Sequence, residues 1–397
     1  MWIGVKRYSK RVIKILFDIF IVFSSRFIIN DKKLIVFSMS RGRYWDNSRA
    51  LFEYVADLSS SKYKVVWLSD PALEIESVPE RYREKVIPRY SFRGWYFLSK
   101  AEVAVISHGF GDYGLFSPIA KSKKALVLWH AITTKYVGLL DEKYTSDRRR
   151  NYKLRESSNY TKLISSSDID RYYSASYTGM DVNNVVITGL PRNDRLFSKT
   201  NKALPSSEFF SILYAPTFRD YPVDSGSVFF PFDCNFKEVA EWANSCKIRI
   251  YLRPHPNDLD SVRHVQELTS NFPNVFIDAR VEKYKDVVDL IFNCDGIVTD
   301  YSSIYVDGLI LDLPTIFVDY DRDQYIKMRG IAYDYELITP GPKVQNWQDF
   351  QYACEEMKDG AAKWANDREL VRKLFFKYRD AKACERVTSL IDEMIKQ

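Results

Sequence analysis

The sequence predicts an α/β protein of two doubly wound domains that face a common cleft. Its 397 residues exceed what a single hydrophobic core usually supports. Short apolar runs alternate with helical patterns along most of the chain, which is typical of parallel sheets covered by helices on both faces. A polar stretch at residues 201–207, which contains Pro205, divides this alternation into two series and is the predicted domain junction.

The first series predicts an N-terminal domain over residues 34–203 and the second a C-terminal domain over residues 204–378. The strands expected in the first domain are 34–38, 63–68, 103–107, 125–129, 163–165 and 185–187, with helices at 46–58 and 92–100. Those expected in the second are 212–215, 247–252, 275–277, 296–298 and 315–318, with a helix at 259–268. Beyond residue 346 only helical patterns remain, and they close with a C-terminal helix in segment 379–397, expected over residues 380–396.

The first 33 residues form a segment of their own. They contain eight basic and two acidic residues, which accounts for the net charge of +6 of the whole chain. Their longest apolar run, residues 19–23, is far shorter than the roughly 20 residues of a spanning helix. Polar residues repeat at helical spacing and form one stripe, namely Arg7, Arg11, Lys14 and Asp18. We expect a helix that lies on an anionic membrane surface, with packing on the protein's own body as the alternative.

Charge and cysteine content exclude several classes of protein. Because the other 364 residues are neutral overall, a chain-wide basic surface is absent and no nucleic-acid partner is expected. The five cysteines are odd in number and form no C-x-x-C pair, which argues against a disulfide framework or a zinc site and fits a reducing cytosol. The Asp-x-Asp pairs at 168–170 and 321–323 lack supporting carboxylates, so no metal site is predicted.

Two histidines follow predicted strands, one in each domain. His130 comes directly after strand 125–129, and His255 follows strand 247–252. Ligands of open parallel sheets bind beyond the carboxyl ends of the strands, and an imidazole exchanges protons near neutral pH. We therefore predict that His130 and His255 are catalytic, although a lone histidine is more often structural. His108 is left open between lining the cleft and capping a turn.

Residues 295–311 predict a phosphate site. An apolar strand pattern stops and a helical pattern begins at Thr299, Asp300, Ser302 and Ser303. The backbone NH groups and dipole of a helix start favour a phosphate, but the same residue types also act as plain helix caps. Other strand ends add candidates for binding the donor's phosphates, namely Arg192, Asn193, Thr217, Arg219 and Arg253. Arg219 and Arg253 could equally pair with Asp220 and Asp258.

An ordered set of short motifs spans most of residues 35–335. It comprises Trp129-His130 with Lys135 and Gly138, Gly189 with Pro191-Arg192-Asn193-Asp194, residues 214–220, residues 253–256, residues 299–303, and Asp321 through Tyr325 to Arg329-Gly330. This set resembles the CDP-glycerol glycerophosphotransferase family, the teichoic-acid primases and polymerases of bacterial envelope synthesis. One departure is that His130-Ala131-Ile132-Thr133 stands where the family usually has His-Gly-Thr-Pro.

The resemblance implies a GT-B fold, a nucleotide held mainly by the C-terminal domain, and peripheral attachment to the cytoplasmic face of the cell membrane. It implies that His130 and His255 correspond to the family's essential histidines, and that Ser302 and Ser303 correspond to its phosphate-binding serines. The matching positions Pro191 and Arg329 join the predicted donor site.

The expected activity is transfer of a polyol phosphate, with glycerol phosphate preferred, from a CDP-linked donor to a hydroxyl of a membrane-associated, lipid-linked glycan or polymer, releasing CMP. Apart from this CDP-polyol co-substrate, no cofactor is expected. One alternative is a GT-B glycosyltransferase that uses a UDP-linked or other sugar nucleotide, because fold does not fix function. The other is a catalytically inactive membrane-associated binding protein. The oligomeric state is left open.

Overall fold

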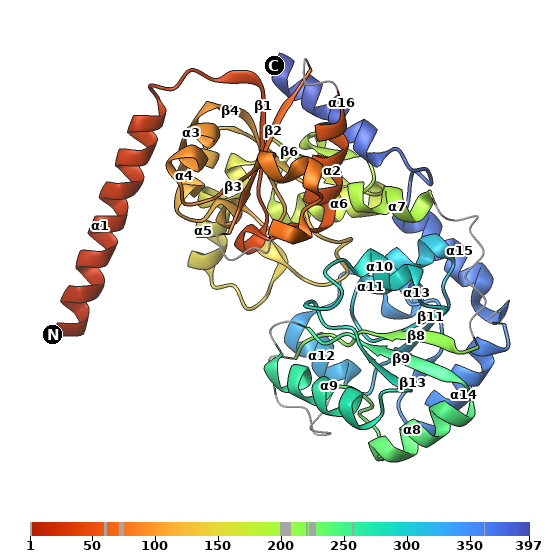
Figure 1. The fold of residues 1–397 in the computed structure, drawn as a ribbon. Helices are drawn as coiled ribbons and strands as arrows, with labels where there is room; N and C mark the ends of the chain where they lie inside the picture. The colour runs from red at the N-terminus through yellow and green to blue at the C-terminus, as the bar shows by residue number, and fades with distance from the viewer. Residues whose placement is uncertain are drawn as a thin grey trace.

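Two parallel sheets form the framework of the molecule (Figure 1). The computed structural model describes residues 2–58, 62–70, 75–198, 208–219, 221, 228–255, 258–360 and 362–397, with the backbone alone for residues 2–13, 41 and 76. The domain junction predicted at residues 201–207 lies outside the described residues.

The N-terminal domain is built on a seven-stranded sheet in the order β3-β2-β1-β4-β5-β6-β7, with all neighbours parallel. The strands are β1 (Asp31–Phe37), β2 (Lys64–Ser69), β3 (Val86–Pro88), β4 (Ala101–Ile106), β5 (Lys124–Val127), β6 (Lys162–Ser165) and β7 (Val185–Ile187). The six strands predicted here are confirmed within a few residues. The edge strand β3 was not predicted.

Helices cover both faces of this sheet, and the central strand β4 shows why. Its Val103 and Val105 belong to one hydrophobic cluster, whereas Ala104 and Ile106 belong to another on the opposite face. The helices of this part of the chain are α1 (Trp2–Ser25), α2 (Asp46–Asp57), α3 (Phe92–Lys100), α4 (Ser117–Ala120), α5 (Ser146–Arg155), α6 (Asp168–Thr178) and α7 (Asp194–Phe197).

The C-terminal domain is built on a six-stranded parallel sheet in the order β10-β9-β8-β11-β12-β13. The strands are β8 (Phe210–Tyr214), β9 (Ile248–Leu252), β10 (Phe276–Asp278), β11 (Gly296–Thr299), β12 (Thr315–Val318) and β13 (Lys343–Val344). The helices are α8 (Phe236–Ser245), α9 (Leu259–Asn271), α10 (Val287–Phe292), α11 (Ile304–Gly308), α12 (Arg322–Arg329), α13 (Tyr335–Ile338), α14 (Trp347–Lys358), α15 (Ala365–Phe375) and α16 (Ala383–Lys396).

The last helix, α16, returns to the N-terminal domain and lies beside α2 (Figure 1). The carboxylate of Asp194 accepts hydrogen bonds from the backbone NH groups of Ala383 and Cys384, both at 2.8 Å. A carboxylate at a helix start satisfies NH groups that have no partner within the helix. The predicted C-terminal helix is thus confirmed, and it begins at Ala383, where this distant carboxylate caps it.

The N-terminal helix α1 runs along the outside of the first domain and contacts α3 and α4 (Figure 1). Ile21 is buried against the domain, whereas Phe20 and Phe23 are 66% and 60% exposed. The predicted stripe residues Arg7 and Arg11 have no described side chains. No helix in the described part of the chain is both long enough and apolar enough to cross a membrane.

Candidate functional site: an interdomain cleft

A strained turn after β5 presents His130 to the cleft. The preceding residue, Trp129, has a φ of +53°, which is uncommon for a residue other than glycine. Two side chains hold this turn: Asn47 Nδ2 donates to the Trp129 carbonyl at 3.1 Å, and Arg192 Nη1 donates to the His130 carbonyl at 2.6 Å. Backbone strain that is held in this way is common at functional sites.

His130 packs face to face against a second histidine, His108. The ring centroids are 4.3 Å apart and the planes differ by 4°. His130 Nδ1 is buried and has no hydrogen-bond partner among the described residues. Burial lowers the pKa of His130 well below its usual value, and the nearby charges of His108 and Arg192 lower it further. The imidazole is therefore neutral at pH 7 and able to accept a proton.

A cavity with about 640 Å³ of empty space, part of it open to solvent, lies between the two domains at this point. Both domains line it, through Met39, Trp45, Asp46, His108, His130, Arg192, Arg253, Val281, Lys285, Asp286 and Val287. His108 thus lines the cleft, which decides the alternative left open by the sequence. His130 and Arg253 face the same cavity from opposite domains, as expected for residues at the carboxyl ends of β5 and β9.

Arg253 is held by backbone carbonyls. Its Nη1 donates to the carbonyls of Ala279 at 2.8 Å and Tyr284 at 2.6 Å. The alternative partner, Asp258, instead caps α9 by accepting from the Ser261 NH. Burial lowers the pKa of Arg253 to about 10, so the guanidinium stays protonated at pH 7. Among the described residues, no carboxylate forms an ion pair with Arg253, and such a cation beside a cavity suits an anionic ligand.

Arg219 joins three strand ends of the second sheet. Its Nη1 donates to Asp300 Oδ2 at 2.6 Å, while Nε and Nη2 donate to the two oxygens of Asp321 at 2.9 and 3.0 Å. Asp300 also accepts from the Thr217 NH at 2.9 Å, and Thr299 Oγ1 donates to the Ala215 carbonyl. The four predicted residues Thr217, Arg219, Thr299 and Asp300 therefore lie together and brace one another. The predicted partner Asp220 lies outside the described residues.

Ser302 and Ser303 lie half-buried between β11 and α11, beside this group. Ser303 occupies the N-cap position of α11, but its side chain makes no capping hydrogen bond. Asp300, another of the three candidate caps, directs its carboxylate to Thr217 and Arg219. The capping alternative therefore accounts for neither Ser303 nor Asp300, and the phosphate-binding role of Ser302 and Ser303 stays a prediction.

Arg192 joins the two domains. Its Nη2 donates to Asp307 Oδ2 at 2.6 Å in the C-terminal domain, and its Nη1 donates to Asp46 Oδ1 at 2.9 Å in the N-terminal domain. Pro191, Arg192 and Asn193 are all buried. Arg192 thus lines the cavity with its guanidinium already shared between two carboxylates and the His130 carbonyl.

His255 lies where the two domains meet, stacked on Phe218 with ring centroids 5.5 Å apart. Burial lowers its pKa, and the charges of Lys135 and Arg329 lower it further. Lys135 belongs to the N-terminal domain, so the structure adds it to a group predicted from the C-terminal domain. The sequence signal that could have identified it is its place in the same motif as His130.

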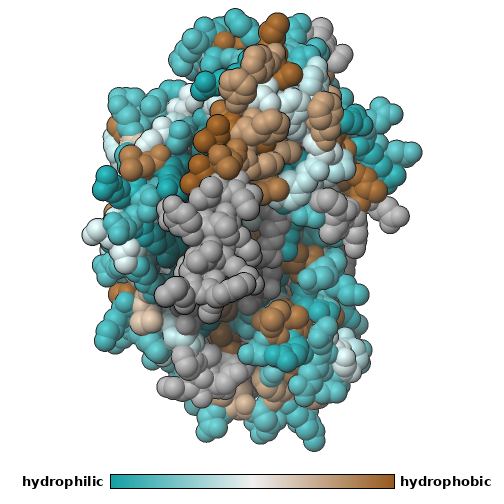
Figure 2. Space-filling model, turned by 90° about the vertical axis from the view of Figure 1, so that its left-hand side faces the viewer, coloured by the Kyte–Doolittle hydropathy of each residue, from teal (hydrophilic) through white to brown (hydrophobic). Residues whose placement is uncertain are grey.

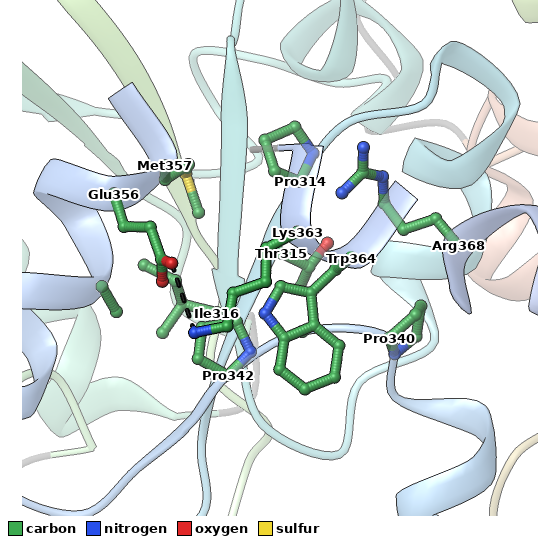
Figure 3. Close-up of a pocket in the computed structure, with 12 residues that line it drawn as sticks. Pro314, Thr315, Ile316, Pro340, Pro342, Glu356, Met357, Lys363, Trp364 and Arg368 are labelled. Carbon is green, nitrogen blue, oxygen red and sulfur yellow. Dashed lines mark ion pairs between the residues drawn. The ribbon is translucent and has the colours of Figure 1, made fainter. Parts of the chain in front are cut away.

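A second cavity, with about 300 Å³ of empty space that is partly open to solvent, lies at the amino ends of β12 and β13 (Figure 3). Pro314, Pro340 and Trp364 line it, and the Lys363–Glu356 ion pair of 3.2 Å lies at its edge (Figure 3). Sheets of this kind bind ligands at the carboxyl ends of their strands, whereas the second cavity lies at the amino ends, so the interdomain cavity is the candidate site.

Among the described residues, no group of three or more His, Cys, Asp or Glu side chains could hold a metal ion.

The profile of the CDP-Glycerol:Poly(glycerophosphate) glycerophosphotransferase family matches residues 19–393. This chain belongs to that family. It is accordingly a polyol-phosphate transferase of teichoic acid synthesis that uses a CDP-linked donor. A solved structure supports the architecture: the structure of the wall teichoic acid polymerase TagF aligns with a TM-score of 0.75 and 22% identity, covering 100% of this chain and 97% of that one. The predicted GT-B fold is confirmed.

Two curated members of the glycerophosphotransferase family illustrate its range of substrates. The teichoic acid glycerol-phosphate transferase of Staphylococcus aureus is 26% identical over 384 residues, covering 91% of this chain and 93% of the relative. The teichoic acid poly(ribitol-phosphate) polymerase of Bacillus spizizenii is 27% identical over 383 residues, covering 86% of this chain and 59% of the relative. Because these identities are nearly equal, they do not select the polyol.

Proposed function

We propose that this protein transfers glycerol phosphate from CDP-glycerol to a hydroxyl of a membrane-associated, lipid-linked glycan or polymer and releases CMP. The observation that carries the proposal is the shared cavity, because it brings a neutral imidazole, His130, to face a cation, Arg253, from the other domain. A base on one wall and an anion-binding group on the other suit attack of a hydroxyl on a phosphate.

In this mechanism His130 removes the proton of the acceptor hydroxyl. The acceptor oxygen then bonds to the phosphorus next to the polyol, the bond from that phosphorus to the CMP oxygen breaks, and CMP departs in line. His255, Arg253 and Arg329 balance the charge that shifts towards CMP. No covalent intermediate with the protein is needed, because donor and acceptor are held together in one cleft.

The donor's phosphates are assigned to the C-terminal domain. Ser302 and Ser303 would donate to phosphate oxygens at the start of α11, next to the group braced by Arg219. Because Arg219 is already shared between Asp300 and Asp321, its proposed role is to hold these strand ends in place. Arg192, shared between Asp46 and Asp307, would likewise hold the His130 turn and the domain contact.

The proposed site of action is the cytoplasmic face of the cell membrane, reached through α1. Viewed from the side of α1, the upper half of the molecule carries a group of hydrophobic side chains (Figure 2). The described part of α1 contributes Phe20, Phe23 and Ile19, all more than half exposed. An exposed apolar helix face is typical of attachment to the membrane interface.

Product analysis tests the proposed activity. We expect the protein, incubated with acceptor and with CDP-glycerol, CDP-ribitol or UDP-sugars in turn, to release CMP from CDP-glycerol at the highest rate. His130→Ala should abolish release, and Ser302→Ala with Ser303→Ala should raise the KM for the donor. Faster release of CMP from CDP-ribitol would show that the transferred group is ribitol phosphate and not glycerol phosphate. Release of UDP without CMP would show that the protein is a glycosyltransferase.

A further inference from the structure

Lys135 belongs to the N-terminal domain but reaches the phosphate site proposed in the C-terminal domain. Its backbone forms an antiparallel bridge with Ile331, and the Ala332 NH donates to the Thr134 carbonyl at 2.9 Å. From the other side, Tyr173 Oη donates to the Lys135 carbonyl at 2.7 Å. The backbone that carries this lysine is therefore fixed between the two domains.

The surroundings of the Lys135 ammonium are mainly positive. Its Nζ lies 3.4 Å from Thr217 Oγ1 and 5.7 Å from the centre of the Tyr325 ring. The positive charges of Arg219 and Arg329 lower the pKa of Lys135, and the charge of Lys135 in turn lowers the pKa of His255. The carboxylate of Asp300 stabilises the Lys135 ammonium but already accepts from the Arg219 guanidinium.

Within the described residues, Lys135 forms no ion pair, which is costly for a desolvated ammonium. Burial, together with the charges of Arg219 and Arg329, accordingly lowers the pKa of Lys135 to about 8 against the opposing effect of Asp300. A multivalent anion bound here would supply the missing negative charge. Its oxygens could accept from the ammonium and from the hydroxyl of Thr217.

We propose that Lys135 binds the phosphoryl group of the CDP-linked donor that carries the polyol. The assignment rests on the proposed function. The group that is transferred must lie on the side of the donor that faces His130, and Lys135 is five positions beyond His130 on the same segment of chain. Lys135 thus meets the donor from the acceptor side, while the C-terminal domain holds the nucleotide. The Lys135 ammonium keeps its proton during the transfer step, because the proton of the acceptor hydroxyl goes to His130.

Binding measurements with CDP and CMP separate the two phosphates. CDP carries the second phosphoryl group and CMP lacks it, so only CDP should contact Lys135. We expect Lys135→Met to weaken CDP binding by about tenfold or more, the usual effect of losing a charge-assisted hydrogen bond, while CMP binding changes little. Lys135→Arg, which keeps the charge, should retain part of the preference for CDP.

Proton uptake gives a second readout. Calorimetry at pH 8 in Tris and in HEPES, whose ionisation enthalpies differ, measures the protons taken up on binding. Because a bound phosphate favours the charged lysine, the unmodified protein should take up part of a proton with CDP, and Lys135→Met should not. A matched control is Lys123→Met: burial also lowers the pKa of Lys123, but its Nζ donates to Asn30 Oδ1 at 2.8 Å, and we expect neither readout to change.

The outcomes distinguish this inference from the proposed function. Equal losses of CDP and CMP binding in Lys135→Met, or an unchanged preference for CDP, would overturn the role of Lys135 and leave the proposed function standing. If the unmodified protein bound neither nucleotide, the proposed donor itself would be wrong, and the role of Lys135 with it. Thermal unfolding of each variant verifies that it is folded.

Discussion

The imidazoles of His108 and His130 lie stacked, with their centroids 4.3 Å apart and their planes within 4° of each other. At this separation two positive charges would repel each other by about 4 kcal/mol at an effective dielectric constant of about 20. A positive charge on His108 therefore disfavours protonation of His130, and it is one cause of the lowered pKa of His130. His108 also faces the cavity.

Replacing His108 by alanine should shift the pH dependence of the reaction. Burial and the charge of His108 both lower the pKa of His130, and the variant would expose His130 and remove that charge. The pKa of His130 then rises, so more of the base is protonated at a given acidic pH. We expect the acidic limb of the kcat/KM profile, measured with CDP-glycerol, to move to higher pH.

His264→Gln is the control for this shift. Burial also lowers the pKa of His264, but its ring packs on Phe236 at the outer face of the second domain, with centroids 4.5 Å apart. The acidic limb should stay in place in that variant. A limb that is also unmoved in His108→Ala would show that His130 is not the titrating base.

The strand positions could be predicted from the sequence because buried parallel strands are continuous apolar runs, but β3 and β13 could not. β3 offers only Val86 and Ile87 before Pro88, and β13 offers only Val344, which is too little apolar sequence to form a pattern. Their positions depend on pairing with β2 and β12. The interdomain cleft was predictable for a related reason, since polar residues follow strands whose carboxyl ends must share an edge.

The partners of the candidate arginines could not be predicted from neighbouring residues. Arg219 pairs with Asp300 and Asp321, which lie 81 and 102 positions away. Arg192 pairs with Asp307 in the other domain, 115 positions away. A sequence shows that a cation follows a strand, but which carboxylate reaches it depends on how the elements pack.

Removing the Arg192 guanidinium should destabilise the protein strongly. Arg192→Met would leave the buried Asp307 carboxylate and the partly buried Asp46 carboxylate without their counter-charge. The loss of one partner from a buried ion pair costs about 3–5 kcal/mol in the free energy of unfolding, which urea denaturation would measure. Arg263→Met is the matched control, because the Arg263–Asp260 pair on α9 is exposed and should contribute at most about 1 kcal/mol. Equal effects of the two substitutions would contradict the interdomain role of Arg192.

Gly330 should resist replacement, because it closes the contact between the domains. Its φ of +71° and ψ of 148° lie in a region that is nearly exclusive to glycine, and an added Cβ would come within 2.2 Å of Tyr136 Cδ2. We expect Gly330→Ala to lower the free energy of unfolding by about 1–3 kcal/mol and to reduce kcat. Gly111→Ala is the control, since a Cβ there would meet nothing within 4 Å. Adding Tyr136→Ala to Gly330→Ala should recover only the part of the lost stability that comes from the clash with the Tyr136 ring. If Gly330→Ala alone were as stable as the unmodified protein, the close contact between Gly330 and Tyr136 would be contradicted.

The exposed face of α1 predicts how the protein meets a membrane. Phe20 and Phe23 are mostly exposed, and burying a phenylalanine in an apolar phase contributes about 1.5–3 kcal/mol. We expect Phe20→Ser with Phe23→Ser to reduce flotation with phosphatidylglycerol-containing vesicles more than tenfold, and removal of residues 1–30 to abolish it. The control pair is Leu259→Ser with Tyr352→Ser, whose side chains are 69% and 67% exposed on the other domain. If α1 attached through its apolar face, the control pair would float as the unmodified protein does. Flotation that persisted in the α1 variants would instead place the membrane contact on another surface.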